Sequence, residues 1–187
     1  MYTYLLLDMP SDHEIEGFVM TECDVIRALL VNKGAGKNVK HIKFTTEESL
    51  KNIPQKPYKG IRYVHMSSHG LKNGIGLIGG TVQWRRVASW IKSYLEPLSD
   101  KQNRVLCLSC CFAEEGARKM RPFLKGYFNG VYYLAERGQF FHTSMVVWSM
   151  FYYRKKKNSP TKRSGKMSSA KKFEDFFGEE VLKSKTL

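Results

Sequence analysis

Five short runs of apolar residues are bounded by loop-forming residues, and each run is typical of a buried β-strand. The five predicted strands are residues 2–8, 39–44, 61–66, 105–108 and 130–135. Longer segments, in which apolar side chains recur at helical spacing, separate or follow these runs. They predict helices over residues 14–31, 82–98, 113–120 and 140–153, the first of them capped by Asp12. A glycine-rich stretch over residues 74–80 indicates a small hairpin.

Strands and helices alternate along the chain, and this order favours a mostly parallel sheet with helices on both faces. We therefore expect an α/β fold of the three-layer sandwich type, in which residues 1–153 form one domain. Residues 154–187 follow as a basic, partly disordered tail. Apolar residues near its end indicate a last helix that docks on the domain: Phe173, Phe176, Phe177, Val181 and Leu182.

The composition is that of a folded domain which needs neither disulfides nor a metal to fold. The chain has 187 residues, 42% of them hydrophobic, which is enough to bury a core. No apolar run approaches the ~20 residues that span a bilayer, and the start of the chain lacks the basic region of a signal peptide. Two of the 4 cysteines are adjacent. We expect reduced thiols and a cytoplasmic location.

The chain carries a formal net charge of +14, and the excess is uneven. Residues 154–187 contain 11 basic and 4 acidic residues, so this short segment carries half of the excess. Such a surplus favours nucleic acid, anionic lipid or acidic proteins as partners. No helix-turn-helix, zinc-finger or RNA-binding sheet signature accompanies it, so nucleic-acid binding through the basic tail is an alternative function and not the leading one.

Residues that can carry chemistry follow two of the predicted strands. His69 and Gly70 lie in the loop after strand 61–66, and Cys110 and Cys111 follow strand 105–108. Parallel strands end at the same edge of a sheet, so the histidine and a cysteine can form a base and a nucleophile there. Gly70 has no side chain to block backbone N–H groups from a substrate oxygen. Successive residues face opposite ways, so only one of the two cysteines can face His69, and the choice between them is open.

Two stretches around these residues match a known family. They are Tyr63-Val64-His65-Met66-Ser67-Ser68-His69-Gly70 and Arg104-Val105-Leu106-Cys107-Leu108-Ser109-Cys110-Cys111. A weaker match is the strand 130–135 with the following helix, which ends in Phe151-Tyr152-Tyr153. Over residues 60–153 the chain resembles the caspase-like cysteine peptidases of clan CD, and most closely their CHAT (caspase–HetF-associated) branch. Cys111 stands at the family's nucleophile position, and Cys110 stands where the family usually has a small residue.

The resemblance implies a role for each of these residues. His69 is the expected general base and acid, and Cys111 is the expected nucleophile that attacks the scissile carbonyl. The backbone N–H groups of Gly70 and Cys111 are expected to hold the oxyanion. The function implied is a cysteine endopeptidase without a cofactor, acting on protein or peptide substrates. Small members of this branch are often controlled by another polypeptide, as in bacterial defence or death-like pathways, so a separate activator is expected.

Acids in the family's S1 pocket often select a basic P1 residue. The matching positions are Asp8, at the end of the first strand, and Glu136, after the fifth. Some relatives also use an acid two residues before the nucleophile, where this chain has Ser109, so the P1 preference stays open. A peptidase that cleaves after lysine or arginine would also find sites in the tail, which raises self-processing as a hypothesis.

Three competing interpretations come from the same segments. The pairs His65/His69 and Cys107/Cys110 have zinc-ligand spacings, but residues 65 and 69 of an extended strand lie ~13 Å apart, so we expect no metal. The spacing of Gly74, Gly76 and Gly79 matches a dinucleotide fingerprint without its strand-then-helix context. His142 is a distant alternative base. As a function, a catalytically inactive caspase-like interaction module is the alternative within the same fold.

Overall fold

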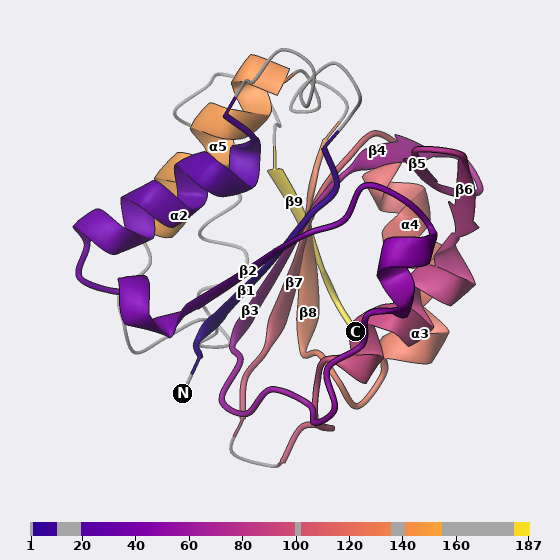
Figure 1. The fold of residues 1–187 in the computed structure, drawn as a ribbon, viewed down its shortest axis with the longest axis horizontal. Coiled ribbons are helices and arrows are strands. Elements are labelled where there is room, and N and C mark those ends of the chain that lie inside the picture. Colours follow the sequence, from indigo (N-terminus) through magenta and orange to yellow (C-terminus); the bar gives the residue numbers. More distant parts are fainter. Residues whose placement is uncertain (1, 11–19, 100–101, 136–140, 155–181) are drawn as a thin grey trace.

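The computed structural model describes residues 2–10, 20–99, 102–135, 141–154 and 182–187 of the chain (Figure 1). Its main sheet has six strands in the order β2-β1-β3-β7-β8-β9. The first five in this order are parallel, and β9 is antiparallel to β8. Their bounds, in sheet order, are Val39–Lys43, Tyr4–Asp8, Tyr63–Ser67, Val105–Ser109, Gly130–Leu134 and Leu182–Thr186. All five strands predicted from the sequence are therefore present.

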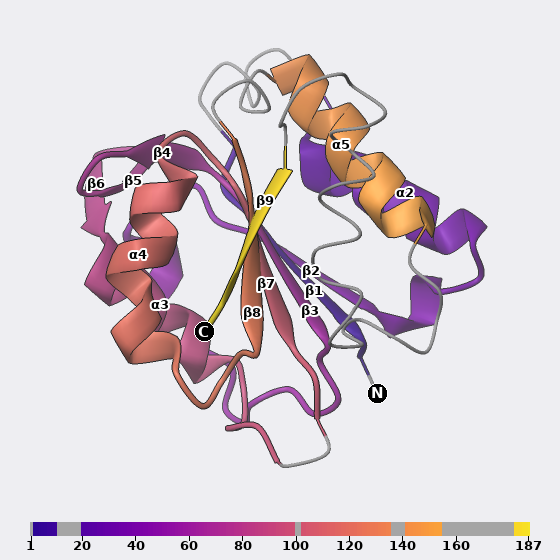
Figure 2. The ribbon, with the colours of Figure 1, turned by 180° about the vertical axis from the view of Figure 1, so that it is seen from behind.

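Helices cover both faces of this sheet. In Figures 1 and 2, α2 (Glu22–Asn32) and α5 (Phe141–Arg154) lie over one face, and α3 (Trp84–Ser93) and α4 (Ala113–Leu124) lie over the other. Two short 3₁₀ turns, Gly36–Asn38 and Glu48–Lys51, flank β2. This arrangement confirms the predicted three-layer α/β sandwich with a mostly parallel sheet.

The central strands build two separate cores, because successive residues of a strand point to opposite faces of the sheet. Leu106 and Leu108 of β7 pack on the side of α3 and α4. Between them, Cys107 packs on the side of α2 and α5. Strands β1, β7 and β8 are buried along their whole length, which explains why the sequence shows them as continuous apolar runs.

Helix α2 begins later than the predicted span of 14–31. Its N-cap is Thr21, whose hydroxyl accepts a hydrogen bond from the backbone N–H of Asp24, while the Asp24 carboxylate accepts one from the backbone N–H of Thr21. This reciprocal capping box fixes the start of the helix at Glu22. Asp12 is therefore not the cap of this helix, and residue 12 itself lies outside the described part of the chain.

The predicted docking helix is wrong at its end, because Leu182 lies in a strand. Strand β9 pairs with β8 so that Leu182 lies opposite Leu134, and both side chains are buried. On the exposed side, the ammonium of Lys185 lies 2.9 Å from Glu114 of α4. One buried residue followed by alternating lysines suits an edge strand better than a helix. The other four members of the predicted helix lie outside the described residues.

The glycine-rich hairpin is a sheet of three short antiparallel strands. These are β4 (His69–Leu71), β5 (Gly74–Leu77) and β6 (Gly80–Gln83). His69 thus begins a strand, whereas the sequence predicts a loop. The helix predicted over 82–98 is shorter and spans Trp84–Ser93, since residues 82 and 83 belong to β6.

Helices long and apolar enough to cross a lipid bilayer do not occur in the part of the chain that the structure describes.

Candidate functional site

The sheet brings His69, Gly70 and Cys111 to one edge. Strands β3 and β7 are parallel neighbours, and Ser67 lies opposite Ser109 at their carboxyl ends. Just beyond, the backbone N–H of Ser68 donates a 3.1 Å hydrogen bond to the carbonyl of Ser109. The two strand extensions therefore run side by side. The sequence-based expectation that these residues approach one another agrees with this geometry.

Gly70 makes the closest approach between the two extensions. A Cβ atom at this position would overlap the carbonyl oxygen of Cys111 and would lie 3.0 Å from its backbone nitrogen. Distances this short to backbone atoms leave no room for any residue except glycine. The backbone of residue 70 is thus held against the backbone of residue 111, and the N–H groups expected to form an oxyanion hole belong to these two segments.

The structure distinguishes the two adjacent cysteines. Cys110 is buried, whereas Cys111 is exposed. Burial raises the pKa of the Cys110 thiol far above its usual range, the neighbouring Cys111 adds to the rise, and a hydrogen bond from Ser68 opposes it. A thiol that resists ionisation is a poor nucleophile. Of the pair, Cys111 is the thiol that a substrate can reach.

Cys111 lies immediately before a strained turn. Phe112 has the left-handed backbone angles φ 53° and ψ 25°, and among the described residues it is the one non-glycine residue with positive φ. An aromatic residue in this region stores conformational strain, which occurs often at functional sites. Helix α4 begins at the next residue, so the strand, the exposed thiol and the helix are joined by a sharp turn.

His69 and Cys111 lie on adjoining segments, but no hydrogen bond joins their side chains. The residue is exposed and pairs with Gly76 of β5 through the backbone. In the described part of the chain, its imidazole forms no side-chain hydrogen bond, neither to the Cys111 thiol nor to a carboxylate. The structure therefore places the base and the nucleophile on adjoining segments, without an assembled Cys–His hydrogen bond.

Asp8 ends β1 at the same edge of the sheet, but its carboxylate is buried and already has partners. Its Oδ2 accepts a 2.6 Å hydrogen bond from the hydroxyl of Thr21 and lies 3.1 Å from Nε2 of His41. The ammonium of Lys43 is 3.9 Å away. Asp8 thus belongs to a polar network under the surface. Glu136, the other predicted acid of the S1 pocket, lies outside the described residues.

A second buried acid, Glu22, is not among the residues singled out from the sequence. One carboxylate oxygen lies 2.8 Å from Nε2 of His65, and the other accepts a 2.9 Å hydrogen bond from the hydroxyl of Ser109. All three side chains are buried. Ser109 is two residues before Cys111, so Glu22 reaches the strand end that precedes the exposed cysteine. The partners of Glu22 are 43 and 87 residues away along the chain, so no local pattern of the sequence indicates these contacts.

The two pairs with zinc-ligand spacing, His65/His69 and Cys107/Cys110, do not belong to a cluster of potential metal ligands in the described residues. His65 is engaged by Glu22, and its ring packs edge-on against Trp148, with centroids 5.0 Å apart. The potential ligand atoms of a different group, Asp8, Cys23 and His41, lie within 4.8 Å of one another. Burial, followed by the charge of Asp8, raises the pKa of the Cys23 thiol well above its usual range. A neutral thiol beside the Lys43 ammonium does not favour a cation.

The chain matches no family model, and a search of curated proteins also finds no match. The assignment of a function therefore rests on the residues and on their geometry.

Proposed function

We propose that this chain is a caspase-like cysteine endopeptidase of the CHAT type, with Cys111 as nucleophile and His69 as general base and acid. The observation that supports this most strongly is the contact of the Gly70 backbone with the backbone of Cys111. Neighbouring parallel strands bring the two segments to one edge, and the glycine at position 70 lets them approach more closely than any other residue would. The exposed thiol, beside a buried one, supports the same assignment.

In the proposed reaction, the Cys111 thiolate attacks the carbonyl carbon of a peptide bond. The negative charge that develops on the carbonyl oxygen is stabilised by the N–H groups of Gly70 and Cys111. His69 takes the thiol proton and delivers it to the leaving amine, so that an acyl-enzyme and a free amino terminus form. A water molecule, deprotonated by His69, then releases the acid product and restores the thiol.

The proposal includes activation by a separate protein in the cytoplasm. The missing side-chain hydrogen bond between His69 and Cys111 motivates it, because an imidazole on a short, exposed strand can be repositioned by a partner or a substrate. A basic P1 residue is the proposed specificity. This specificity rests on the resemblance, because the buried carboxylates of Asp8 and Glu22 already have hydrogen-bonding partners within the protein.

The first test measures the reactivity of each thiol. Wild type and His69→Ala are alkylated with limiting iodoacetamide near pH 6, where an ordinary thiol with a pKa near ~8.5 is protonated. We expect fast labelling at Cys111 that slows in His69→Ala, with the buried Cys110 as an unreactive internal control. The activator, if needed, is supplied by a lysate of the source cells. Slow, equal labelling of Cys111 in both proteins under every condition contradicts a dyad.

The second test uses two glycines of neighbouring strands, Gly70 in β4 and Gly76 in β5. Gly70→Ala places a methyl group on the Cys111 backbone, so we expect loss of peptide cleavage by at least roughly 100-fold, the effect of removing an oxyanion-hole donor. Gly76→Ala is the control, because the nearest atom to its added methyl is 3.8 Å away, on His69. Cleavage by Cys111→Ala, or equal effects of the two glycine variants, would count against the proposed site.

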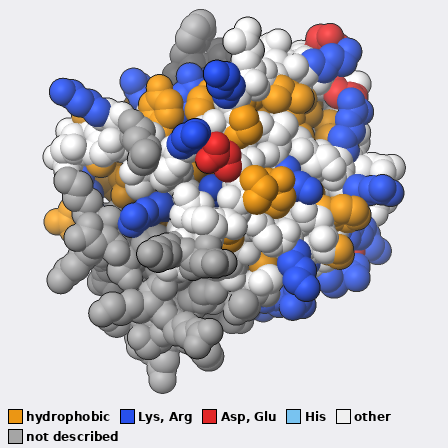
Figure 3. Space-filling view, turned by 90° about the horizontal axis from the view of Figure 1, so that it is seen from below, with side chains coloured by type: hydrophobic (Ala, Val, Ile, Leu, Met, Phe, Trp, Pro, Cys, Tyr) orange, Lys and Arg blue, Asp and Glu red, His pale blue; other side chains and the backbone are white. Residues whose placement is uncertain are grey.

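One observation favours a second candidate function, the inactive interaction module. The unassembled pair of His69 and Cys111 is the arrangement expected if the fold has kept its shape and lost turnover. Such a module would retain partner binding in Cys111→Ala and never cleave a peptide. Nucleic-acid binding has weaker support: on the face where the parallel strands begin, lysine and arginine side chains are spread widely and do not form one stripe (Figure 3).

A further inference from the structure

Glu22 joins the two strands that lead to the candidate site. One of its carboxylate oxygens lies 2.8 Å from Nε2 of His65 in β3, and the other accepts a 2.9 Å hydrogen bond from the hydroxyl of Ser109 in β7. His69 follows β3 along the chain, and Cys111 follows β7. A single buried carboxylate therefore bridges the strand before the proposed base and the strand before the proposed nucleophile.

Ser109 connects this bridge to the last hydrogen bond between the two strand ends. It is the final residue of β7, and its carbonyl accepts the 3.1 Å hydrogen bond from the backbone N–H of Ser68. Its hydroxyl donates to Glu22 at the same time. Just beyond, the backbone of Gly70 lies against that of Cys111. Glu22 thus holds the residue that precedes the two segments proposed to form the oxyanion hole.

The backbone of Glu22 is itself fixed in place. Glu22 is the first residue of α2 and directly follows the N-cap Thr21, whose side chain forms the capping box with Asp24. The hydroxyl of Thr21 also donates a 2.6 Å hydrogen bond to the carboxylate of Asp8, the last residue of β1. The start of α2 is therefore bonded to three adjacent strands, β1, β3 and β7. A side chain on such a rigid element positions its partners more precisely than one on a loop.

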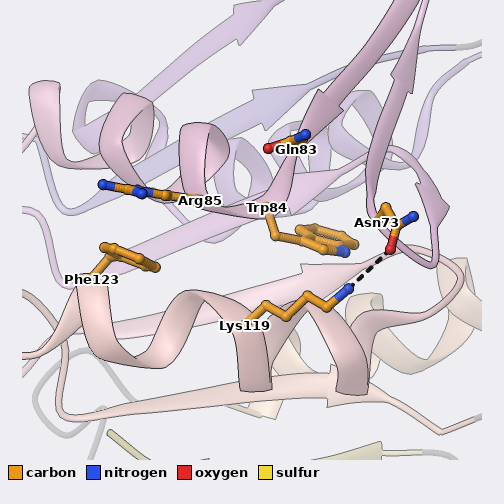
Figure 4. A pocket seen from close by; sticks show the side chains of 6 residues that line it. All are labelled: Asn73, Gln83, Trp84, Arg85, Lys119 and Phe123. Atoms are coloured by element: carbon orange, nitrogen blue, oxygen red, sulfur yellow. Dashed lines mark hydrogen bonds between the residues drawn. The ribbon is translucent and has the colours of Figure 1, made fainter.

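A second side-chain contact reaches the strand that begins with His69, but it lies at the surface. Figure 4 shows a pocket beside the three-stranded sheet, in which Lys119 of α4 points toward Asn73 in the β4–β5 turn. The Lys119 ammonium donates hydrogen bonds of 3.1 Å to the Asn73 amide oxygen and of 3.0 Å to the carbonyl of Lys72. Exposed hydrogen bonds replace equivalent bonds to water, so their net contribution is small. The buried contact of Glu22 is therefore the stronger support of the edge.

We propose that Glu22 is a positioning residue of the peptidase site, which acts through Ser109 on the placement of Cys111 against Gly70 and His69. This inference rests on the proposed function. Groups that take part in catalysis must be held within about 0.5 Å of their productive positions, and a displacement of about 1 Å lowers the rate by roughly 100-fold. Glu22 does not touch the substrate. Its role is to keep the end of β7 in register with the end of β3.

The test measures kcat and KM of the full chain on an internally quenched fluorescent peptide with arginine at P1, under the conditions of the alkylation test and with Cys111→Ala as blank. We expect kcat to fall roughly tenfold in Ser109→Ala and roughly 100-fold in Glu22→Ala, with KM unchanged because substrate binding is not altered. Glu22→Gln retains activity. Its amide oxygen accepts from Ser109, and its amide N–H donates to Nε2 of His65, whose Nδ1 lacks a hydrogen-bond partner in the described part of the chain and can carry the ring proton.

Hydrogen exchange of the Ser68 amide, followed by NMR, measures the anchoring of the strand end without any cleavage. Ser109→Ala keeps the carbonyl that binds this amide, so exchange that is roughly tenfold faster shows that the hydroxyl contact to Glu22 holds the strand end. Tyr94→Phe is the matched control. It removes one hydroxyl hydrogen bond, of 3.0 Å to the Asn52 carbonyl, on the side of α3 and α4, and is expected to change neither kcat nor the exchange of Ser68.

The outcomes separate this inference from the proposed function. An equal loss of kcat in Glu22→Gln and Glu22→Ala overturns the inference, because the charge and not the pair of hydrogen bonds would then matter. With an active wild type, unchanged kcat or unchanged Ser68 exchange in Ser109→Ala also overturns it, and so does an equal loss of kcat in Tyr94→Phe. If wild type cleaves no more than Cys111→Ala while the Ser68 exchange responds as expected, the peptidase function fails, and the catalytic role of Glu22 fails with it.

Discussion

The two faces of the main sheet use the same strands but bury different chemistry. On the side of α3 and α4, the strand residues that point inward are apolar, as Leu106 and Leu108 show. On the side of α2 and α5, the polar side chains of Asp8, Glu22 and His65 are buried as well, near the carboxyl ends of β1 and β3. The polar groups of this second face lie below the candidate nucleophile.

The buried residues of the two faces contribute differently to stability and to function. A buried aliphatic side chain contributes about 2–3 kcal/mol, but a buried charge costs free energy unless partners compensate it. Asp8 and Glu22 each have two or more partners, so their network is tolerated and adds little net stability. Selection for stability alone favours apolar residues at these positions. The acids are therefore best explained by the chemistry of the adjoining edge.

The largest effect is expected on the apolar face. Leu108→Ala leaves a cavity in the centre of β7, so we expect the free energy of unfolding to fall by about 4 kcal/mol, as for other buried leucines. Urea unfolding followed by circular dichroism measures this change. A loss below ~1 kcal/mol would mean that this face is loosely packed, and would remove the contrast between the two faces.

On the polar face, Glu22→Ala is expected to cost about 3 kcal/mol, because it leaves the His65 imidazole and the Ser109 hydroxyl buried without their partner. Ser109→Ala is the matched variant: it removes one hydrogen bond to Glu22 and is expected to cost about 1 kcal/mol. The same unfolding measurement applies. If Glu22→Ala were stabilising, the network would be a burden on the fold, which would strengthen the functional interpretation of the acid.

The fold was largely accessible from the sequence. Strands buried on both faces appear as uninterrupted apolar runs, as in Val105–Ser109, and alternate with amphipathic helices. The edge strand β9 could not be predicted from the sequence, because a single buried residue, Leu182, does not make a repeating pattern of apolar and polar positions. The late start of α2 depends on Thr21 and Asp24, whose reciprocal bonds form only once both are in place.

The candidate site was accessible in part. Strand ends at one edge were enough to bring His69 and Cys111 together, since parallel strands share their direction. Strand alternation left the choice between Cys110 and Cys111 open and only the resemblance favoured Cys111, whereas the structure separates them by the burial of Cys110 and the exposure of Cys111. Glu22 was missed because its partners are 43 and 87 residues away, and such contacts have no signature in a single sequence.

The smallest effect is expected at the rim of the polar face, where Asp24 and Lys43 form an ion pair of 2.7 Å. Burial alone raises the pKa of Asp24, but hydrogen bonds from Lys43 and from the Thr21 backbone outweigh it and lower the pKa. A carboxyl group whose pKa is lower in the folded than in the unfolded chain stabilises the fold when the pH is above its unfolded-state pKa, near ~3.9. This contribution is lost as the pH falls through the folded-state pKa. The pair is partly exposed, so it is worth less than ~1 kcal/mol. Lys43→Gln should therefore lower the free energy of urea unfolding slightly at pH 6 and not at pH 2. A difference that stays constant over this pH range would show that Lys43 acts through packing and not through the charge of Asp24.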